Sequence, residues 1–195
     1  MTEGLGYSER LQRLELARWK RVLDVQAPYR WNVRRLCRGR VLDVGCGIGR
    51  NLEHLAGRAV GVDHNPTSVA VARSRGLDAL TVGEFFAESG PAFGSFDTLL
   101  AAHLLEHLDR SAADEVLRSY LPYLRPGSHV VLITPQERGW ASDATHVRWV
   151  GPRELGQAAD SLGLEDVRQR SFPFPAPAGK VFRYNEFVMV GRTPS

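Results

Sequence analysis

The sequence has few lysines, few cysteines and no long apolar run. Only two of its 195 residues are lysines, and its two cysteines, Cys37 and Cys46, have no spacing typical of a metal site. This cysteine content argues against a disulfide scaffold and favours a reducing, cytoplasmic setting. No apolar run approaches the ~20 residues of a membrane-spanning helix, and residues 1–7 lack the charged and apolar regions of a secretory signal. We therefore expect a cytoplasmic protein with no membrane span and no metal.

The charge is small in total but unevenly distributed. The net charge of +3 divides into +6 for residues 1–40, which carry ten basic and four acidic side chains, and −3 for the remainder. Such a basic segment could meet an anionic substrate, nucleic acid or a membrane surface, or it could be the solvated face of a helix. The contents of 43% hydrophobic and 24% charged residues are those of an ordinary globular domain.

Strand and helix patterns alternate from residue 40 onward. We expect strands over residues 41–44, 59–63, 79–82, 96–101, 129–134, 167–172 and 186–190, and helices over residues 8–25, 29–36, 51–56, 65–75, 111–124 and 152–162. The alternation predicts an α/β fold, a parallel sheet with helices on both faces. No helical pattern separates the last two strands, so these should form an antiparallel hairpin.

Two local signals and one division of the chain complete this prediction. Ser111–Asp114 is similar to a capping box at the start of its helix. The proline-rich residues 172–177 should be extended, because a residue before proline is displaced from the helical region. We expect residues 1–38 to form a helical flank or lid and residues 39–195 to form the α/β domain.

A glycine-rich turn, Gly-Cys-Gly-Ile-Gly at residues 45–49, follows the strand that contains Asp43. Glycine allows a tight turn and close approach of a ligand. A dinucleotide fingerprint requires a third glycine where Arg50 stands, so a pyrophosphate fits poorly. Asp63 ends the next strand, where its carboxylate can accept hydrogen bonds from both hydroxyls of a ribose. These features favour a ribonucleoside that carries positive charge.

Residues 41–49 closely resemble the first motif of class I S-adenosylmethionine-dependent methyltransferases, and further motifs of this family follow in order. Residues 60–63 are similar to its second motif, residues 96–100 to its fourth-strand motif, Glu106-His107 to a pair common among small-molecule members, and residues 121–128 to the segment before its fifth strand. The resemblance is greatest to the branch that includes quinone-biosynthesis methyltransferases. It implies a Rossmann-like, doubly wound seven-stranded sheet of order 3-2-1-4-5-7-6 with the last strand antiparallel, an N-terminal helical extension, and S-adenosyl-L-methionine as cofactor.

The resemblance also implies roles for individual residues. Asp43 would help to hold the amino group of the methionine moiety, Asp63 would bind the ribose, and Glu84 would receive the adenine amino group, where the family often has aspartate. Asp43 could instead cap the glycine turn, and Cys46 could merely fill it. The residues implied to contact the cofactor are Asp43, Gly45, Cys46, Gly47, Asp63, His64, Glu84, Phe85, Ala102 and His103.

Transfer of a methyl group to oxygen usually needs a general base, and histidine suits neutral pH. The candidate catalytic residues are His103, His107 and His146, of which His107 could equally be a structural hydrogen-bond partner. We predict methyl transfer to a small-molecule acceptor, with oxygen slightly favoured. The alternatives are an RNA or protein methyltransferase, which only the basic segment supports, and a non-catalytic protein that binds S-adenosylmethionine.

The acceptor site should lie between the N-terminal helices and the loops at residues 136–149 and 173–185. These segments do not belong to the alternating strands and helices of the predicted core. These segments hold most of the large aromatic side chains, namely Trp19, Tyr29, Trp31, Trp140, Trp149, Phe174, Phe182 and Tyr184. The alternative is that these aromatic residues fill space beneath long loops.

Overall fold

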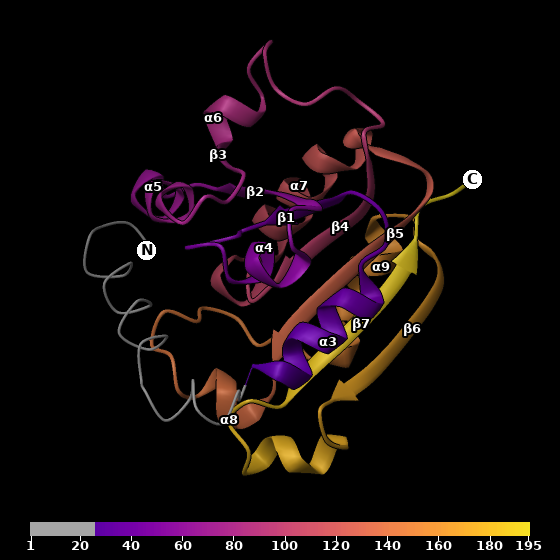
Figure 1. Cartoon of the computed structure of the whole chain (residues 1–195). Helices are drawn as coiled ribbons and strands as arrows, with labels where there is room; N and C mark the ends of the chain where they lie inside the picture. Colours follow the sequence, from indigo (N-terminus) through magenta and orange to yellow (C-terminus); the bar gives the residue numbers. More distant parts are fainter. Residues whose placement is uncertain (1–25) are drawn as a thin grey trace.

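The computed structural model describes residues 26–195, so the helix expected over residues 8–25 lies outside the described residues. Seven strands of the described part form one sheet (Figure 1). The elements in chain order are α3 (Ala27–Leu36), β1 (Val41–Val44), α4 (Arg50–Leu55), β2 (Ala59–Asp63), α5 (Pro66–Ser74), β3 (Ala79–Thr81), α6 (Val82–Phe85), β4 (Phe96–Ala102), η1 (Leu105–His107), α7 (Arg110–Tyr120), η2 (Leu121–Tyr123), β5 (Leu124–Pro135), α8 (Glu137–Trp140), α9 (Pro152–Ser161), β6 (Glu165–Phe172), η3 (Ala176–Lys180) and β7 (Glu186–Arg192).

The strand order β3-β2-β1-β4-β5-β7-β6 confirms the predicted topology. β1 is parallel to β2 on one side and to β4 on the other. The chain continues from β1 to β2 in one direction across the sheet and from β4 to β5 in the opposite direction, so the switch point lies between β1 and β4. Ligands of open α/β sheets bind at such a point, beyond the carboxyl ends of the strands. β7 is antiparallel to β5 and β6, which confirms the hairpin and brings Glu186 opposite Pro135 at this same edge.

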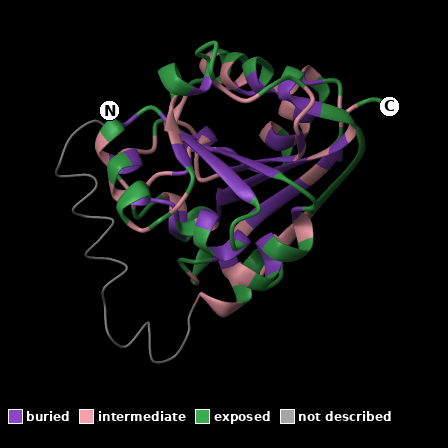
Figure 2. Cartoon of the chain, turned by 45° about the horizontal axis from the view of Figure 1, so that its top comes forward, coloured by how far each residue is buried: buried purple, intermediate pink, exposed green. Residues whose placement is uncertain are grey.

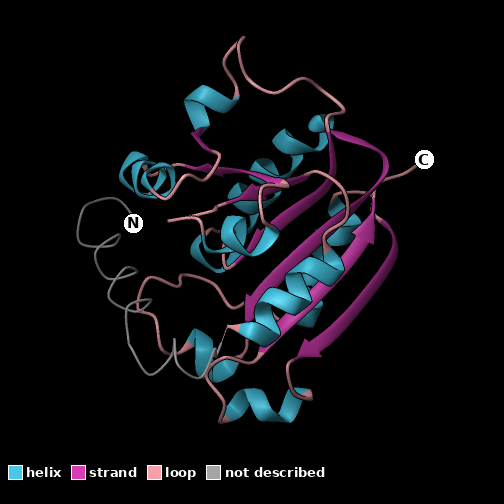
Figure 3. Cartoon of the chain, viewed as in Figure 1, coloured by secondary structure: helices cyan, strands magenta, loops and turns pink. Residues whose placement is uncertain are grey.

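Helices cover both faces of the sheet (Figures 1 and 3). Side chains of α3, α4 and α5 pack into one buried cluster, and side chains of α6, α7 and α9 pack into the other. Along β4, Leu99 belongs to one cluster and Leu100 to the other, because successive side chains of a strand point to opposite faces. The central strands β1, β2 and β4 are accordingly buried between helices whose outer faces are exposed (Figure 2), whereas the edge strand β6 has no buried residue.

Helix α3 belongs to the predicted flank, residues 1–38, and it is packed on the sheet. Its Asn32 and Val33 are 1% and 4% exposed. The Tyr29 ring meets the Phe172 ring of β6 edge to face, at 5.8 Å between centroids. No helix within residues 26–195 has both the length and the apolar character that crossing a membrane requires.

The predicted capping box at Ser111 is wrong. Helix α7 begins one residue earlier, and Asp109 is its N-cap, with an extended backbone and a side chain that accepts a hydrogen bond from the Ala112 N–H at 2.9 Å. Aspartate is at least as good an N-cap as serine, so the upstream acid sets the start of the helix.

Two further predictions fail at prolines. The helix expected over residues 111–124 stops at Tyr120, and β5 begins at Leu124, where the chain already pairs with Phe96 of β4. Residues 172–177 are not extended throughout, because η3 begins at Ala176 with Pro177 in its first turn, a position that tolerates proline.

Candidate active site

The glycine turn lies at the carboxyl end of β1 and is tied to β2. The N–H groups of Gly45 and Cys46 donate to the carbonyl of Val62, at 2.8 and 3.1 Å. Gly49 has φ +91°, and a Cβ atom at this position would collide with the Leu77 side chain. Both its backbone conformation and its surroundings therefore require glycine. The thiol of Cys46 is buried, which raises its pKa and makes it a filler of the turn rather than a nucleophile.

Asp63, at the end of β2, braces this turn from the other side. Its Oδ2 accepts a hydrogen bond from the Gly47 N–H and its Oδ1 accepts one from the Asn65 N–H, both at 2.8 Å. Nδ1 of the half-exposed His64 lies 3.5 Å from Oδ1. Each carboxylate oxygen can accept more than one hydrogen bond, so Asp63 retains acceptor capacity for ribose hydroxyls.

Asp43 is a buried carboxylate, 1% exposed, beside the Asn51 side chain. Neither of its oxygens makes a hydrogen bond of good geometry among residues 26–195. Burial raises the pKa of Asp43 to about 7, a rise that the nearby Asn51 amide partly offsets and the charge of Asp63 reinforces. Such a group is costly unless a donor or a cation satisfies it. The ammonium group of S-adenosylmethionine is a ligand of that kind, and the residues of this crevice fit the cofactor.

Glu84 and Phe85 have structural tasks in the described fold. The Oε2 atom of Glu84 accepts hydrogen bonds from Arg73 Nη2 and from the N–H of Thr81, both at 2.7 Å, in a capping box at the start of α6. The hydrogen bond from Arg73, followed by those from Thr81, lowers the pKa of Glu84 to about 2. The Phe85 ring packs against Tyr123, with ring centroids 4.6 Å apart, and the whole residue is 0% exposed, so Phe85 belongs to the core beneath the crevice.

His103 follows Ala102 at the carboxyl end of β4 and has a left-handed backbone, with φ +57°. Its N–H donates to the Ile133 carbonyl of β5 at 2.9 Å. Nδ1 of its ring lies 3.3 Å from Glu106 Oε1, and Nε2 lies 3.0 Å from Glu186 Oε1. Burial by itself would lower the pKa of His103, but the pairing with Glu106 and Glu186 outweighs it and raises this pKa to about 10. At neutral pH His103 is therefore a cation and a poor proton acceptor.

His107 and His146 lie side by side above the same buried Glu106. Their ring centroids are 4.8 Å apart, and His146 Nε2 lies 4.0 Å from Glu106 Oε1. Nδ1 of His107 bonds the Thr145 carbonyl at 3.2 Å, and Nδ1 of His146 bonds the Trp140 carbonyl at 2.8 Å. A carbonyl can only accept, so a proton on each Nδ1 satisfies both contacts. Burial lowers the pKa of His107, which suits a proton acceptor at neutral pH.

The two loops expected to flank the acceptor lie at this edge of the sheet. The Tyr29 hydroxyl of α3 donates to the Tyr184 carbonyl at 2.7 Å, which joins α3 to the loop at residues 173–185. Within the loop at residues 136–149, the rings of Trp140 and Trp149 meet edge to face, with ring centroids 6.0 Å apart. Trp19 lies outside the described residues.

Glu186 is the residue at this site that the motifs do not indicate. It stands at the start of β7 and is brought to His103 only by the antiparallel return of the chain. One signal is present in the sequence: Glu186 is the only acidic residue after Asp166. The complete burial of Glu106 was also not predicted, although this residue belongs to the recognised Glu-His pair.

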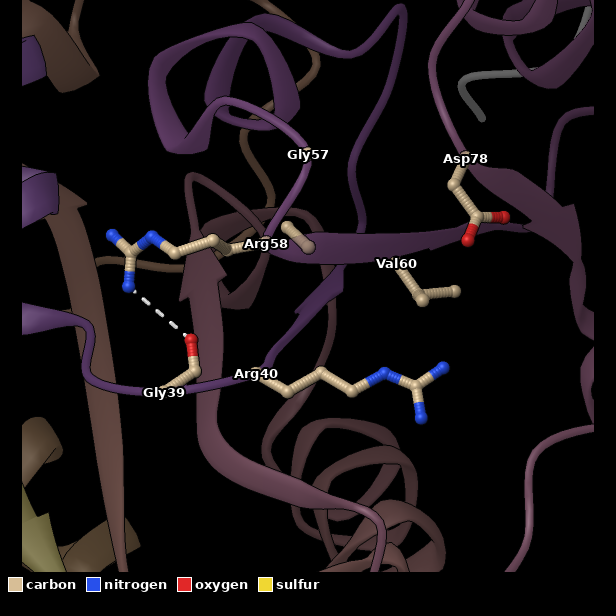
Figure 4. Close-up of a pocket in the computed structure, with 7 residues that line it drawn as sticks. Gly39, Arg40, Gly57, Arg58, Val60 and Asp78 are labelled. Carbon is tan, nitrogen blue, oxygen red and sulfur yellow. Dashed lines mark hydrogen bonds between the residues drawn. The ribbon is translucent and has the colours of Figure 1, made fainter.

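A separate hollow lies at the opposite edge of the sheet, where β1 and β2 begin (Figure 4). It has a volume of about 350 Å³, and an Arg58 guanidinium nitrogen donates to the Gly39 carbonyl at its wall, at 3.2 Å. Its other lining residues include Arg40 and Asp78. It lies at the amino ends of the strands, so it forms no part of the crevice beside the glycine turn.

Comparison with known sequences agrees with the motifs. The family model described as a methyltransferase domain matches residues 8–169. A ubiquinone biosynthesis O-methyltransferase of Xanthomonas oryzae is 32% identical over 107 residues, which are 51% of this chain and 44% of that relative. Another protein of that name, from Marinobacter nauticus, is 31% identical over 105 residues, 49% of this chain and 43% of its own. The chain thus matches less than half the length of these curated relatives.

Solved structures share the fold. A SAM-dependent methyltransferase from Archaeoglobus fulgidus has a TM-score of 0.68 and 20% identity, covering 87% of this chain and 93% of its own. A SAM-dependent methyltransferase from Thermotoga maritima, described as a possible histamine N-methyltransferase, has a TM-score of 0.71 and 17% identity, covering 96% and 98%. Since the family model spans most of the sequence and the motifs converge on one crevice, the chain belongs to the methyltransferase domain family, as a class I S-adenosylmethionine-dependent member.

Proposed function

We propose that this chain transfers a methyl group from S-adenosylmethionine to a small-molecule acceptor, with oxygen as the favoured accepting atom. The observation that carries the proposal is the buried carboxylate of Asp43, which has no hydrogen bond of good geometry among the described residues and lies beside the glycine turn that Asp63 holds. Relatives named ubiquinone biosynthesis O-methyltransferase support oxygen as the accepting atom.

Each residue of the crevice has a task in this proposal. Asp43 accepts from the cofactor's ammonium group, Asp63 binds the ribose hydroxyls, and the backbone of Gly45 and Gly47 borders the methionine moiety. His64 lies against the adenine. When bound, the cofactor supplies a methyl group already activated by the positive charge on sulfur, so the protein's main task is to position the acceptor.

Further contacts with the cofactor are proposed at the carboxyl ends of β3 and β4. Glu84 and Phe85 follow β3 at the position implied for the adenine, but the Glu84 carboxylate already caps α6 and the Phe85 ring is buried. We therefore assign the adenine contact of this segment to the exposed Glu84, through its backbone and its unused carboxylate oxygen, with Phe85 supporting it from the core. Ala102 and His103 would border the methyl group from the end of β4.

A histidine removes the proton of a hydroxyl acceptor in this proposal. His107 and His146 are better placed than His103, because Nδ1 of each bonds a backbone carbonyl while both nitrogens of His103 face carboxylates. The acceptor enters between α3 and the loops at residues 136–149 and 173–185.

The test is calorimetric titration with S-adenosylmethionine, followed by a screen of cell-extract metabolites with cofactor labelled in the methyl group. Stoichiometric binding and label in a small molecule are the expected results. Label in RNA or protein instead would overturn the choice of acceptor, and binding without any transfer would indicate a non-catalytic binding protein. Absence of cofactor binding would overturn the whole proposal.

A further inference from the structure

His103 lies between two glutamates that come from different parts of the chain. Glu106, in η1, faces Nδ1 at 3.3 Å, and Glu186, at the start of β7, faces Nε2 at 3.0 Å. A carboxylate at neutral pH only accepts, and a neutral imidazole has a single N–H to donate. Only the protonated ring can donate toward both carboxylates at once. The geometry therefore favours the imidazolium form of His103.

The ionisable groups around this ring add up to an excess of negative charge. They are Glu106 and His107 from η1, Glu186 from β7, His146 from the loop after α8, and Tyr29 from α3, whose hydroxyl lies near Glu186. Burial, followed by the charge of Glu186, raises the pKa of Tyr29, so this hydroxyl stays neutral. With His103 protonated, two carboxylates therefore face one cationic ring.

Glu106 is the more buried of the two carboxylates. The side chain of Glu106 is 0% exposed and that of Glu186 is 12% exposed. Neither oxygen of Glu106 makes a hydrogen bond of good geometry within the described part of the chain, so its contact with His103 Nδ1 at 3.3 Å is an ion pair. His146 Nε2 lies 4.0 Å from Glu106, and the charge of Glu106 also raises the pKa of the adjacent His107. Glu106 is therefore placed to stabilise positive charge on either histidine.

We propose that Glu186 is a positioning residue: by pairing with His103 it holds this ring as a fixed cation and leaves the buried charge of Glu106 to serve as counter-ion to His107 and His146. The inference rests on the proposed function, in which one of these histidines takes the acceptor's proton. As the proton moves from the acceptor hydroxyl to Nε2, a positive charge appears on that imidazole, and Glu106 stabilises it.

The proposal also restricts the class of acceptor. A cluster with net negative charge repels an anion, so the acceptor that fits carries a neutral hydroxyl and keeps its proton until the histidine removes it. Acceptors that are already ionised at neutral pH, such as carboxylates or strongly acidic phenols, should bind poorly.

The test is NMR titration of the histidine rings in the full chain without acceptor, with signals assigned from single His→Gln variants. In the wild type, His103 is expected to remain protonated until about pH 10. In Glu186→Gln its midpoint should fall by at least about one unit, the scale of one opposite charge at this distance. Glu186→Asp, which retains the charge, should give an intermediate midpoint. In Glu106→Gln the midpoint of His107 should fall as well.

Glu165→Gln, at the distant end of the β6–β7 hairpin, is the matched control and should move neither midpoint. A wild-type His103 that titrates near 6.5, or a midpoint that Glu186→Gln leaves unchanged, would overturn the positioning role. An unchanged His107 midpoint in Glu106→Gln would overturn the counter-ion role. These readouts need no turnover, so they separate this inference from the proposed function, whose failure would appear as absent cofactor binding or transfer.

Discussion

Replacing Asp63 with alanine tests the centre of the proposed cofactor site. In the free protein the carboxylate accepts hydrogen bonds from the N–H groups of Gly47 and Asn65, both at 2.8 Å. Loss of a partner for a part-buried donor costs about 1–3 kcal/mol, so we expect Asp63→Ala to lose about 2–4 kcal/mol of unfolding free energy. Urea denaturation monitored by circular dichroism measures this loss.

The same substitution should weaken cofactor binding by about 2–3 kcal/mol, or roughly 30- to 150-fold, because hydrogen bonds to a charged group are lost. Calorimetric titration measures this change directly. At a cofactor concentration of 100 times the wild-type Kd, the wild type should gain about 2.7 kcal/mol of stability, whereas Asp63→Ala should gain only about 0.3–0.9 kcal/mol.

Asp97→Ala is the matched control for this experiment. Asp97 also accepts a backbone hydrogen bond, from Arg40 at 2.8 Å, and pairs with Arg125, but it lies at the amino end of β4. This variant should lose stability and keep its cofactor affinity. If Asp63→Ala bound the cofactor as tightly as the wild type, the ribose role and the crevice built around it would be refuted.

Three further outcomes are expected. The pKa of Asp43 is raised to about 7 from its ordinary value near 4. The folded state therefore loses stability as the pH rises between these two values, by up to roughly 1.4 kcal/mol per pH unit. Asp43→Asn should accordingly unfold at a higher temperature than the wild type at pH 8, and it should bind the cofactor more weakly. Phe85→Ala should cost about 3–5 kcal/mol in urea denaturation, since its ring is fully buried, and a loss under 1 kcal/mol would contradict its place in the core. His107→Gln and His146→Gln should show which histidine is the base, by a fall in kcat of about 10²- to 10⁴-fold at unchanged calorimetric affinity; if His103→Gln alone had this effect, His103 would be the base.

The positions of the strands were largely predictable because each carries a local signal, and their order was implied by the resemblance of the motifs. β2 is an apolar run that ends in Asp63, and β1 is followed at once by the glycine turn, so both could be located from neighbouring residues. The start of α7 was not predicted correctly, because Asp109 and Ser111 are both good caps and only the backbone geometry shows which one is used.

The sequence alone was enough to locate the predicted cofactor crevice. Turn geometry, strand ends and the motifs that name the family depend on residues adjacent in the chain, and their contacts follow once the parallel strands are aligned. It did not determine the protonation of the histidines. His103, His107 and His146 are equivalent candidates in the sequence, but the fold places two carboxylates on His103 and a backbone carbonyl on each of the others. Glu186 reaches His103 from 83 residues away only because β7 runs antiparallel to β5. Proton affinity depends on burial and on charges within a few ångströms, and tertiary structure alone sets both.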